Sequence, residues 1–202
     1  MWVVLLLATA ATPEVRYLAL GDSFTIGTGS SESQAFPSRL KPLLEKKRAT
    51  PVKLLNPAVN GYSTQELIDD ELPTVEAFKP TLVTLAVGAN DIVRGRGPDD
   101  YRANLKKIFA ALPAKASVVS IPQPDWSRTP VAKHFGDPDA LQKQIVLYNR
   151  ILEEETKAAG GRYVDLWPLM RKQADAKQLA PDGLHPNAQA HAQWAEALVR
   201  EL

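Results

Sequence analysis

The sequence predicts an α/β protein, built as a three-layer α/β/α sandwich around a parallel five-stranded sheet. Short apolar runs alternate with helical patterns along the 202 residues, and strands that alternate with helices form βαβ units with parallel strands. The runs are continuous and rich in Val, Ile and Leu, which is typical of strands buried on both faces. Right-handed crossovers between such strands place helices on both sides of the sheet.

Five segments have the length and composition of strands: residues 15–20, 52–55, 82–87, 117–121 and 162–165. Helical patterns fill the intervals, at residues 34–48, 64–78, 99–112, 140–159, 166–177 and 187–202. Proline lacks the N–H donor that a helix interior needs, so it marks where helices begin or break. We expect Pro98 to start one helix and Pro73 to interrupt another. The first helix should bend at Pro37 or Pro42.

Composition limits the class of protein. With 45% hydrophobic residues, the chain is long enough for one well-buried domain, expected over residues 13–202. Lys and Arg (24) balance Asp and Glu (23) without a basic stripe, so we expect no nucleic-acid partner. The lack of cysteine rules out disulfides, thiolate metal sites and cysteine nucleophiles. The three histidines lack zinc spacing and no Gly-Lys-Ser/Thr phosphate loop occurs, so we expect no metal or cofactor.

The N-terminal residues 1–12 have features of a signal or leader segment. Residues 2–8 are apolar, and Ala8-Thr9-Ala10 fits the pattern of a signal-peptidase site. The run is too short to span a bilayer, so no stable membrane insertion is expected. The positively charged start of a secretory signal is missing, since no Lys or Arg precedes Arg16. We expect a secreted or periplasmic protein, with an apolar N-terminal strand in a cytoplasmic protein as the alternative.

Four short motifs lie after predicted strands or before a helix. Gly21-Asp22-Ser23 follows the first strand, Asn60-Gly61 the second, and Gly88-Ala89-Asn90-Asp91 the third. Asp182-Gly183-Leu184-His185 precedes the last helix. Each motif alone also fits ordinary turn and helix-cap chemistry. Because ligands of parallel sheets bind beyond the carboxyl ends of the strands, we expect the motifs to gather at one edge.

Together these motifs supply the parts of an acyl-transfer site. Asp182 lies three residues before His185, so its carboxylate can orient the imidazole and stabilise the protonated ring. The imidazole can then act as general base for a Ser23 nucleophile. The backbone N–H of Gly61 and the side-chain amide of Asn90 can donate to a developing oxyanion.

In this order the motifs resemble the SGNH branch of the GDSL esterase/lipase family, over residues 15–202. The resemblance implies a flavodoxin-like sheet. It implies Ser23 as the nucleophile, His185 as the base and Asp182 as the residue that orients the base. It also implies that the oxyanion is bound by the Ser23 N–H, by Gly61 and by Asn90.

Neighbouring residues have supporting roles in this interpretation. Asp22 and Asp91 are expected behind the reacting groups, where Asp91 can fix its loop by accepting backbone N–H bonds. Phe24 stands where the family has Leu, and should pack behind the nucleophile. Asn60 stands where the family often has Ser, which leaves the neighbouring backbone donor in place.

The segment 122–138 follows the fourth strand and should border the same edge of the sheet. It carries Trp126 and His134, which are candidates for substrate contact, because long loops in compact domains are usually functional. His191, in the last helix, is expected at the surface.

The sequence therefore predicts a serine esterase that hydrolyses a small-molecule carboxylic ester, with short acyl or acetyl groups favoured. The same residues could also serve a lysophospholipase, a thioesterase or an acyltransferase, and these are the alternative functions. The complete set of reacting groups argues against a non-catalytic binding module.

Overall fold

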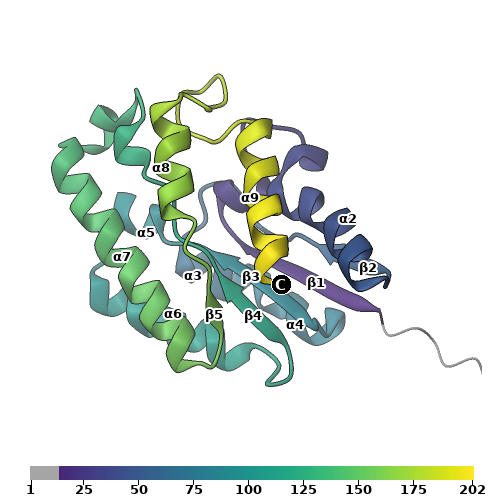
Figure 1. Ribbon diagram of the computed structural model, residues 1–202. Coiled ribbons are helices and arrows are strands. Elements are labelled where there is room, and N and C mark those ends of the chain that lie inside the picture. The colour runs from purple at the N-terminus through teal and green to yellow at the C-terminus, as the bar shows by residue number, and fades with distance from the viewer. Residues whose placement is uncertain (1–13) are drawn as a thin grey trace, which may run out of the picture.

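The computed structural model describes residues 14–202 (Figure 1), so the leader expected at residues 1–12 lies outside the described residues. Its centre is a sheet of five parallel strands in the order β2-β1-β3-β4-β5, which confirms the predicted flavodoxin-like arrangement. The strands are β1 (Val15–Gly21), β2 (Val52–Leu55), β3 (Leu82–Ala86), β4 (Ser117–Ser120) and β5 (Arg162–Tyr163).

Helices cover both faces of this sheet (Figure 1). On one face α2 (Phe36–Arg48) packs against α9 (Ala188–Glu201). On the other face α6 (Pro98–Ala111) packs against α7 (Pro138–Ala158), and α4 (Pro73–Phe78) lies beside β1. The other helical segments are α1 (Ser23–Ile26), η1 (Glu32–Gln34), α3 (Thr64–Glu66), η2 (Leu67–Glu71), α5 (Ala89–Val93), η3 (Trp126–Arg128), η4 (Ala132–Phe135) and α8 (Trp167–Asp175). No helix within residues 14–202 is both long and apolar enough to cross a membrane.

Three of the four prolines considered in the sequence analysis lie in the first turn of a helix, and the fourth lies inside one. Pro98 lies in the first turn of α6, and Pro73 separates α4 from the preceding helical residues, both as the sequence predicted. The turn before Pro73, η2, is π-helical, which the sequence did not predict. Pro37 lies in the first turn of α2, where its missing N–H is tolerated. Pro42 lies inside α2, yet the helix continues to Arg48.

The two central strands place their following turns side by side. β1 pairs with β3 in register from Tyr17–Leu82 to Gly21–Ala86, so both strands reach the same edge of the sheet together. β2 pairs with the other side of β1. The chain therefore leaves the sheet at the same edge after each of the first three strands, although β2 ends level with Leu18, three residues before the end of β1.

His191 differs from its predicted position, because it is completely buried rather than at the surface. Its ring lies 6.5 Å from that of Phe36 and 5.2 Å from that of Trp194, between ring centroids. Both ring nitrogens lack a hydrogen-bond partner among the described residues. Burial, together with the charge of nearby His185, lowers the pKa of His191 to about 4.

Burial of His191 should make the fold sensitive to acid. Its pKa is depressed on folding, so the unfolded chain binds the proton more tightly and stability falls as pH drops from 6.5 towards about 4. Fully developed, this loss is roughly 3 kcal/mol. His191→Leu should therefore lose less free energy of unfolding between pH 7 and 4.5 than the wild type, measured by urea denaturation. The exposed His134→Leu is the control; equal acid sensitivity of His191→Leu and the wild type would contradict the prediction.

Candidate active site

Ser23 is held in a tight turn at the end of β1. The strand stops at Gly21, Asp22 caps the short helix α1, and Ser23 is the first residue of that helix. The Phe24 N–H donates to Asp22 Oδ1 at 3.0 Å, which fixes the turn. Phe24 is buried, and its ring lies 5.3 Å from the His185 ring between centroids. The aromatic side chain thus packs between the nucleophile turn and the histidine.

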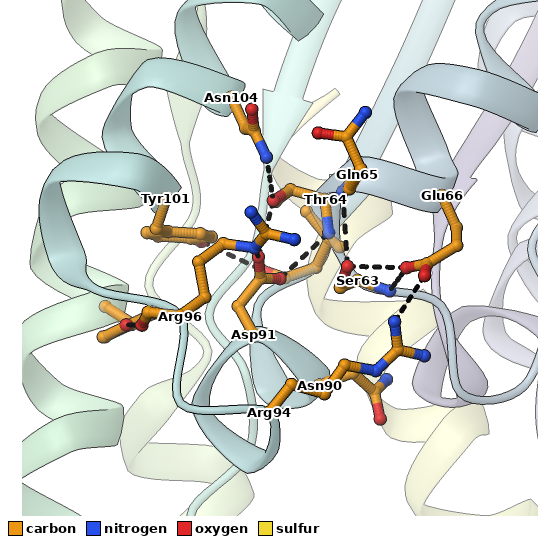
Figure 2. A network of polar contacts seen from close by, with 12 residues as sticks. Ser63, Thr64, Gln65, Glu66, Asn90, Asp91, Arg94, Arg96, Tyr101 and Asn104 are labelled. Atoms are coloured by element: carbon orange, nitrogen blue, oxygen red, sulfur yellow. Dashed lines mark hydrogen bonds and ion pairs between the residues drawn. The ribbon is translucent and has the colours of Figure 1, made fainter.

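The loop after β2 is held against the turn after β3. Gly61 has φ +85°, a left-handed conformation that favours glycine. The Asn90 side-chain amide donates to the Tyr62 carbonyl at 2.9 Å, and Arg94 donates to the Gly61 carbonyl at 2.7 Å. Arg94 also pairs with Glu66 (Figure 2). One N–H of the Asn90 amide is therefore used to anchor the loop, and the second remains for another acceptor.

Asp91 is the acceptor of a buried network that supports this loop (Figure 2). It accepts the Thr64 N–H at 2.9 Å and the Thr64 hydroxyl at 2.6 Å, and it forms an ion pair with Arg96 at 2.9 Å. Asn104 donates to Thr64 Oγ1 at 3.0 Å. Burial raises the pKa of Asp91, although hydrogen bonds from Thr64 and the charge of Arg96 oppose the rise. The network joins α3, α5 and α6 into one unit.

Asn90 and Asp91 lie in a short helix, α5, where the sequence suggested an irregular turn. The helix places the Asn90 side chain toward the loop of Gly61 and the Asp91 side chain into the protein interior. Two adjacent residues of this helix therefore fix the loop after β2 at two places, Asn90 at Tyr62 and Asp91 at Thr64.

Asp182 holds the His185 ring. The Asp182 Oδ2 atom lies 2.8 Å from His185 Nδ1, and Oδ1 accepts the N–H groups of Leu184 at 2.8 Å and His185 at 3.0 Å. Partial burial raises the pKa of Asp182, but these hydrogen bonds outweigh it and the pKa is lowered. The carboxylate therefore stays ionised beside the ring and fixes its orientation.

The loop that carries His185 packs closely on the segment after the nucleophile turn. Its backbone is tied by the Ala180 N–H, which donates to the His185 carbonyl at 2.7 Å. Gly29, at φ +83°, touches this loop: a Cβ there would lie 2.5 Å from the Ala180 Cβ and 3.3 Å from Asp182 Oδ2. Only glycine allows this approach.

A cavity of about 180 Å³ joins these elements. It is lined by Ser23, Phe24, Asn60, Gly61, Ala89, Asn90, Val93, Trp126, Phe135, Leu184 and His185. In the part of the chain that is described, no hydrogen bond joins the Ser23 hydroxyl to the His185 ring, a contact that catalytic pairs often tighten only around substrate. Within residues 14–202, no group of three His, Asp or Glu side chains has the arrangement of a metal site.

The segment 122–138 reaches the cavity through Trp126 and Phe135, whose rings meet edge to face at 5.3 Å between centroids. His134 is exposed and does not line the cavity. Sequence reasoning missed Thr64 and Arg94. They act through partners 27 and 33 residues away, so no local pattern marks them.

Comparison with known proteins places this site in a family. Residues 19–193 match the GDSL-like Lipase/Acylhydrolase family. An arylesterase of Vibrio mimicus is 26% identical over 200 residues, which cover 97% of this chain and 92% of the relative. Thioesterase 1/protease 1/lysophospholipase L1 of Escherichia coli (strain K12) is 24% identical over 204 residues, covering 100% and 89%. Axe2, an acetylxylan esterase from Geobacillus stearothermophilus, has the same fold, with TM-score 0.72, 19% identity and 93% of each chain covered.

The chain therefore belongs to the GDSL-like lipase/acylhydrolase family, as the order of its motifs suggested. The family match spans most of the chain, and the similarity to the arylesterase covers nearly all of both proteins. The protein is a carboxylic ester hydrolase.

The close approach at Gly29 provides a test of how the histidine loop is positioned. Gly29→Ala should displace the loop of Ala180 and His185, because the new Cβ overlaps it, and esterase activity should fall at least tenfold. Stability should fall by roughly 1–3 kcal/mol. Gly160→Ala is the matched control, since Gly160 also has positive φ (+76°) but an open surrounding. Similar activity losses in both variants would show that backbone strain alone, and not the contact, is responsible.

Proposed function

We propose that the protein hydrolyses carboxylic esters with a catalytic triad of Ser23, His185 and Asp182, through an acyl-enzyme intermediate. The proposal rests mainly on the proximity of these residues. Ser23 and His185 line one cavity, and Asp182 Oδ2 is hydrogen-bonded to His185 Nδ1 at 2.8 Å. Because the carboxylate faces Nδ1, the other nitrogen, Nε2, is left to take the serine proton.

The reaction begins when His185 Nε2 takes the proton of the Ser23 hydroxyl and Oγ attacks the ester carbonyl carbon. Asp182 stabilises the imidazolium that forms. The carbonyl oxygen becomes an oxyanion, which accepts hydrogen bonds from the Ser23 N–H, the Gly61 N–H and the free N–H of Asn90. Removing one such donor typically costs about 3–4 kcal/mol of transition-state stabilisation.

The acyl group then passes to water in a second half-reaction. His185 donates its proton to the leaving alcohol, and the acyl group stays on Ser23 Oγ. A water molecule is deprotonated by His185 and attacks the acyl carbonyl, the carboxylic acid leaves, and Ser23 regains its proton. These steps need no metal or cofactor.

The cavity favours short acyl groups. Its volume of about 180 Å³ lies below the roughly 300 Å³ at which pockets for drug-sized ligands begin. No Lys, Arg, Asp or Glu is among the described residues that line it, and most of its walls are apolar. A small neutral acyl group, from acetyl to butyryl, fits this size and polarity.

Exposed apolar side chains at the cavity favour a second class of substrate, with a long acyl chain. Val93 and Phe135 line it and are 49% and 39% exposed, so they offer apolar surface to the chain of a lysophospholipid or a fatty acyl thioester. The Escherichia coli relative is named for thioesterase and lysophospholipase activities. An acyltransferase would use the same acyl-enzyme, and would be recognised by acyl transfer to an added alcohol or sugar.

Loss of either reacting group should abolish most activity. Ser23→Ala and His185→Ala should each lower kcat/KM for p-nitrophenyl acetate by roughly 10⁴-fold or more, because the two residues act as a unit. Asp182→Asn should cost less, since nucleophile and base both remain. Ser33→Ala, at an exposed serine, should match the wild type, and urea midpoints would check that each variant is folded. A folded His185→Ala variant with most of its activity would exclude the triad.

Substrate length provides a separate test of the cavity. Across p-nitrophenyl esters, kcat/KM should be highest from acetate to butyrate and fall beyond about eight carbons, because each CH₂ gains about 0.8 kcal/mol only where a wall buries it. Trp126→Ala removes a wall and should raise octanoate relative to acetate, while Trp167→Ala, away from this cavity, should not. Values of kcat/KM that climb from hexanoate to palmitate would favour the lysophospholipase or lipase-like alternative.

A further inference from the structure

A second buried acid lies against the nucleophile turn. Glu71, the last residue of the π-helical turn η2, is completely buried, and its Oε2 atom accepts the Gly21 N–H at 3.0 Å. Asp22, which follows Gly21, is also completely buried. One oxygen on each carboxyl, Glu71 Oε1 and Asp22 Oδ2, has no hydrogen-bond partner among the described residues.

The π-helical turn is what directs Glu71 to this place. Each additional residue rotates the following helix side chains by about 100° about the helix axis. Without the wide turn, the position of Glu71 would face away from the Gly21 N–H. Such turns recur at functional sites, and here the turn delivers a carboxyl group to the residue two positions before Ser23.

The groups that act on Glu71 offer no positive charge. They are Asp22 from the nucleophile turn and Asp70 from its own helical turn, both acidic. The cations on the elements packed against η2 are engaged elsewhere or exposed: Arg16 of β1 donates to the Lys79 carbonyl, Arg102 of α6 pairs with Glu154 and Glu155, and Lys106 and Lys107 of α6 are exposed. The other ionisable groups on these elements are also engaged or exposed: Tyr17 of β1 bonds to Thr84, Glu66 of α3 to Arg94 and Tyr101 of α6 to the Val87 carbonyl, while Glu76, Asp99 and Asp100 are exposed. Arg96 forms its ion pair with a third buried acid, Asp91.

Burial without a cation favours the neutral form of both acids. Burial raises the pKa of Glu71 to about 8, against the opposing hydrogen bond from Gly21, and Asp22 and Asp70 raise it further. Burial likewise raises the pKa of Asp22 to about 8, opposed by the Phe24 N–H and assisted by Asp91. A carboxyl whose pKa is raised keeps its proton at neutral pH and loses it as the pH rises through that value.

We propose that Glu71 is a positioning residue that holds the nucleophile turn as a neutral carboxylic acid, and that its ionisation switches ester hydrolysis off at alkaline pH. The inference rests on the proposed function for Ser23. The oxyanion of the transition state forms at the Ser23 N–H, so a new negative charge behind that turn destabilises it. The turn has no room to relax, because a Cβ at Gly21 would already lie 2.2 Å from Thr25 Oγ1 and 2.3 Å from the Ala86 carbonyl.

The first test is the pH profile of kcat/KM from pH 6 to 9.5 with a neutral short-chain ester. The wild type should lose at least fivefold between pH 7.5 and 9.5. Glu71→Gln, which mimics the neutral acid, should stay within about threefold of its own pH 7.5 value across that range, because the amide does not ionise there. Glu76→Gln, an exposed acid on the next helix, should keep the wild-type decline. An unchanged alkaline decline in Glu71→Gln, or none in the wild type, overturns the proposal.

A second measurement does not depend on catalysis. Infrared spectra of the wild type in D₂O should contain a protonated-carboxyl C=O band at pH 7 that disappears by pH 9.5, and Glu71→Gln should lack the Glu71 part of this band while Asp22 keeps its own. If the wild type and Glu71→Gln have the same band at pH 7, the proposal for Glu71 is wrong, whatever the esterase assays give. If Ser23→Ala stays active while the two spectra differ, the proposed function fails and the protonation of Glu71 stands.

Discussion

The parallel, in-register pairing of β1 with β3 is the constraint on which the site depends. It brings Gly21 and Ala86 level at one edge of the sheet, so the turns that follow carry Ser23 and Asn90 to the same place. Burial of both strands on both faces holds this register, because slipping by one residue would expose or misplace apolar side chains along the whole strand. β2, on the other side of β1, adds the loop of Gly61.

Around that edge, polar side chains fix the loops through hydrogen bonds to backbone carbonyl and N–H groups. Asn90 and Arg94 donate hydrogen bonds to the neighbouring carbonyls of Tyr62 and Gly61. Asp91 accepts the N–H of Thr64. Each such hydrogen bond contributes only about 1 kcal/mol. Leaving a buried partner unsatisfied costs more, so the network favours a single arrangement of the loops. Such rigidity suits oxyanion donors, which act best when they are placed before the reaction begins.

The sequence was sufficient for the parallel sheet and the cavity residues Ser23, Gly61, Asn90 and His185, because apolar runs and strand-end motifs are local patterns and parallel strands end at one edge. The strand order followed from the family resemblance. It was insufficient where contacts between distant segments decide. The local sequence predicts that His191 is an exposed polar residue of the last helix, but packing against Phe36, far away in the sequence, and against Trp194 buries it. No local pattern in residues 67–71 predicts a π-helical turn, or the hydrogen bond that the Gly21 N–H donates to Glu71.

The most direct test of the central claim is to find where a covalent intermediate forms. The protein is treated with a short alkyl p-nitrophenyl phosphonate, which mimics the acylation transition state, and the adduct is located by mass spectrometry of proteolytic peptides. We expect one equivalent bound at Ser23 in the wild type, and labelling slowed by several orders of magnitude in His185→Ala. Stoichiometric labelling at another residue, or ester hydrolysis that persists after Ser23 is fully modified, would contradict it.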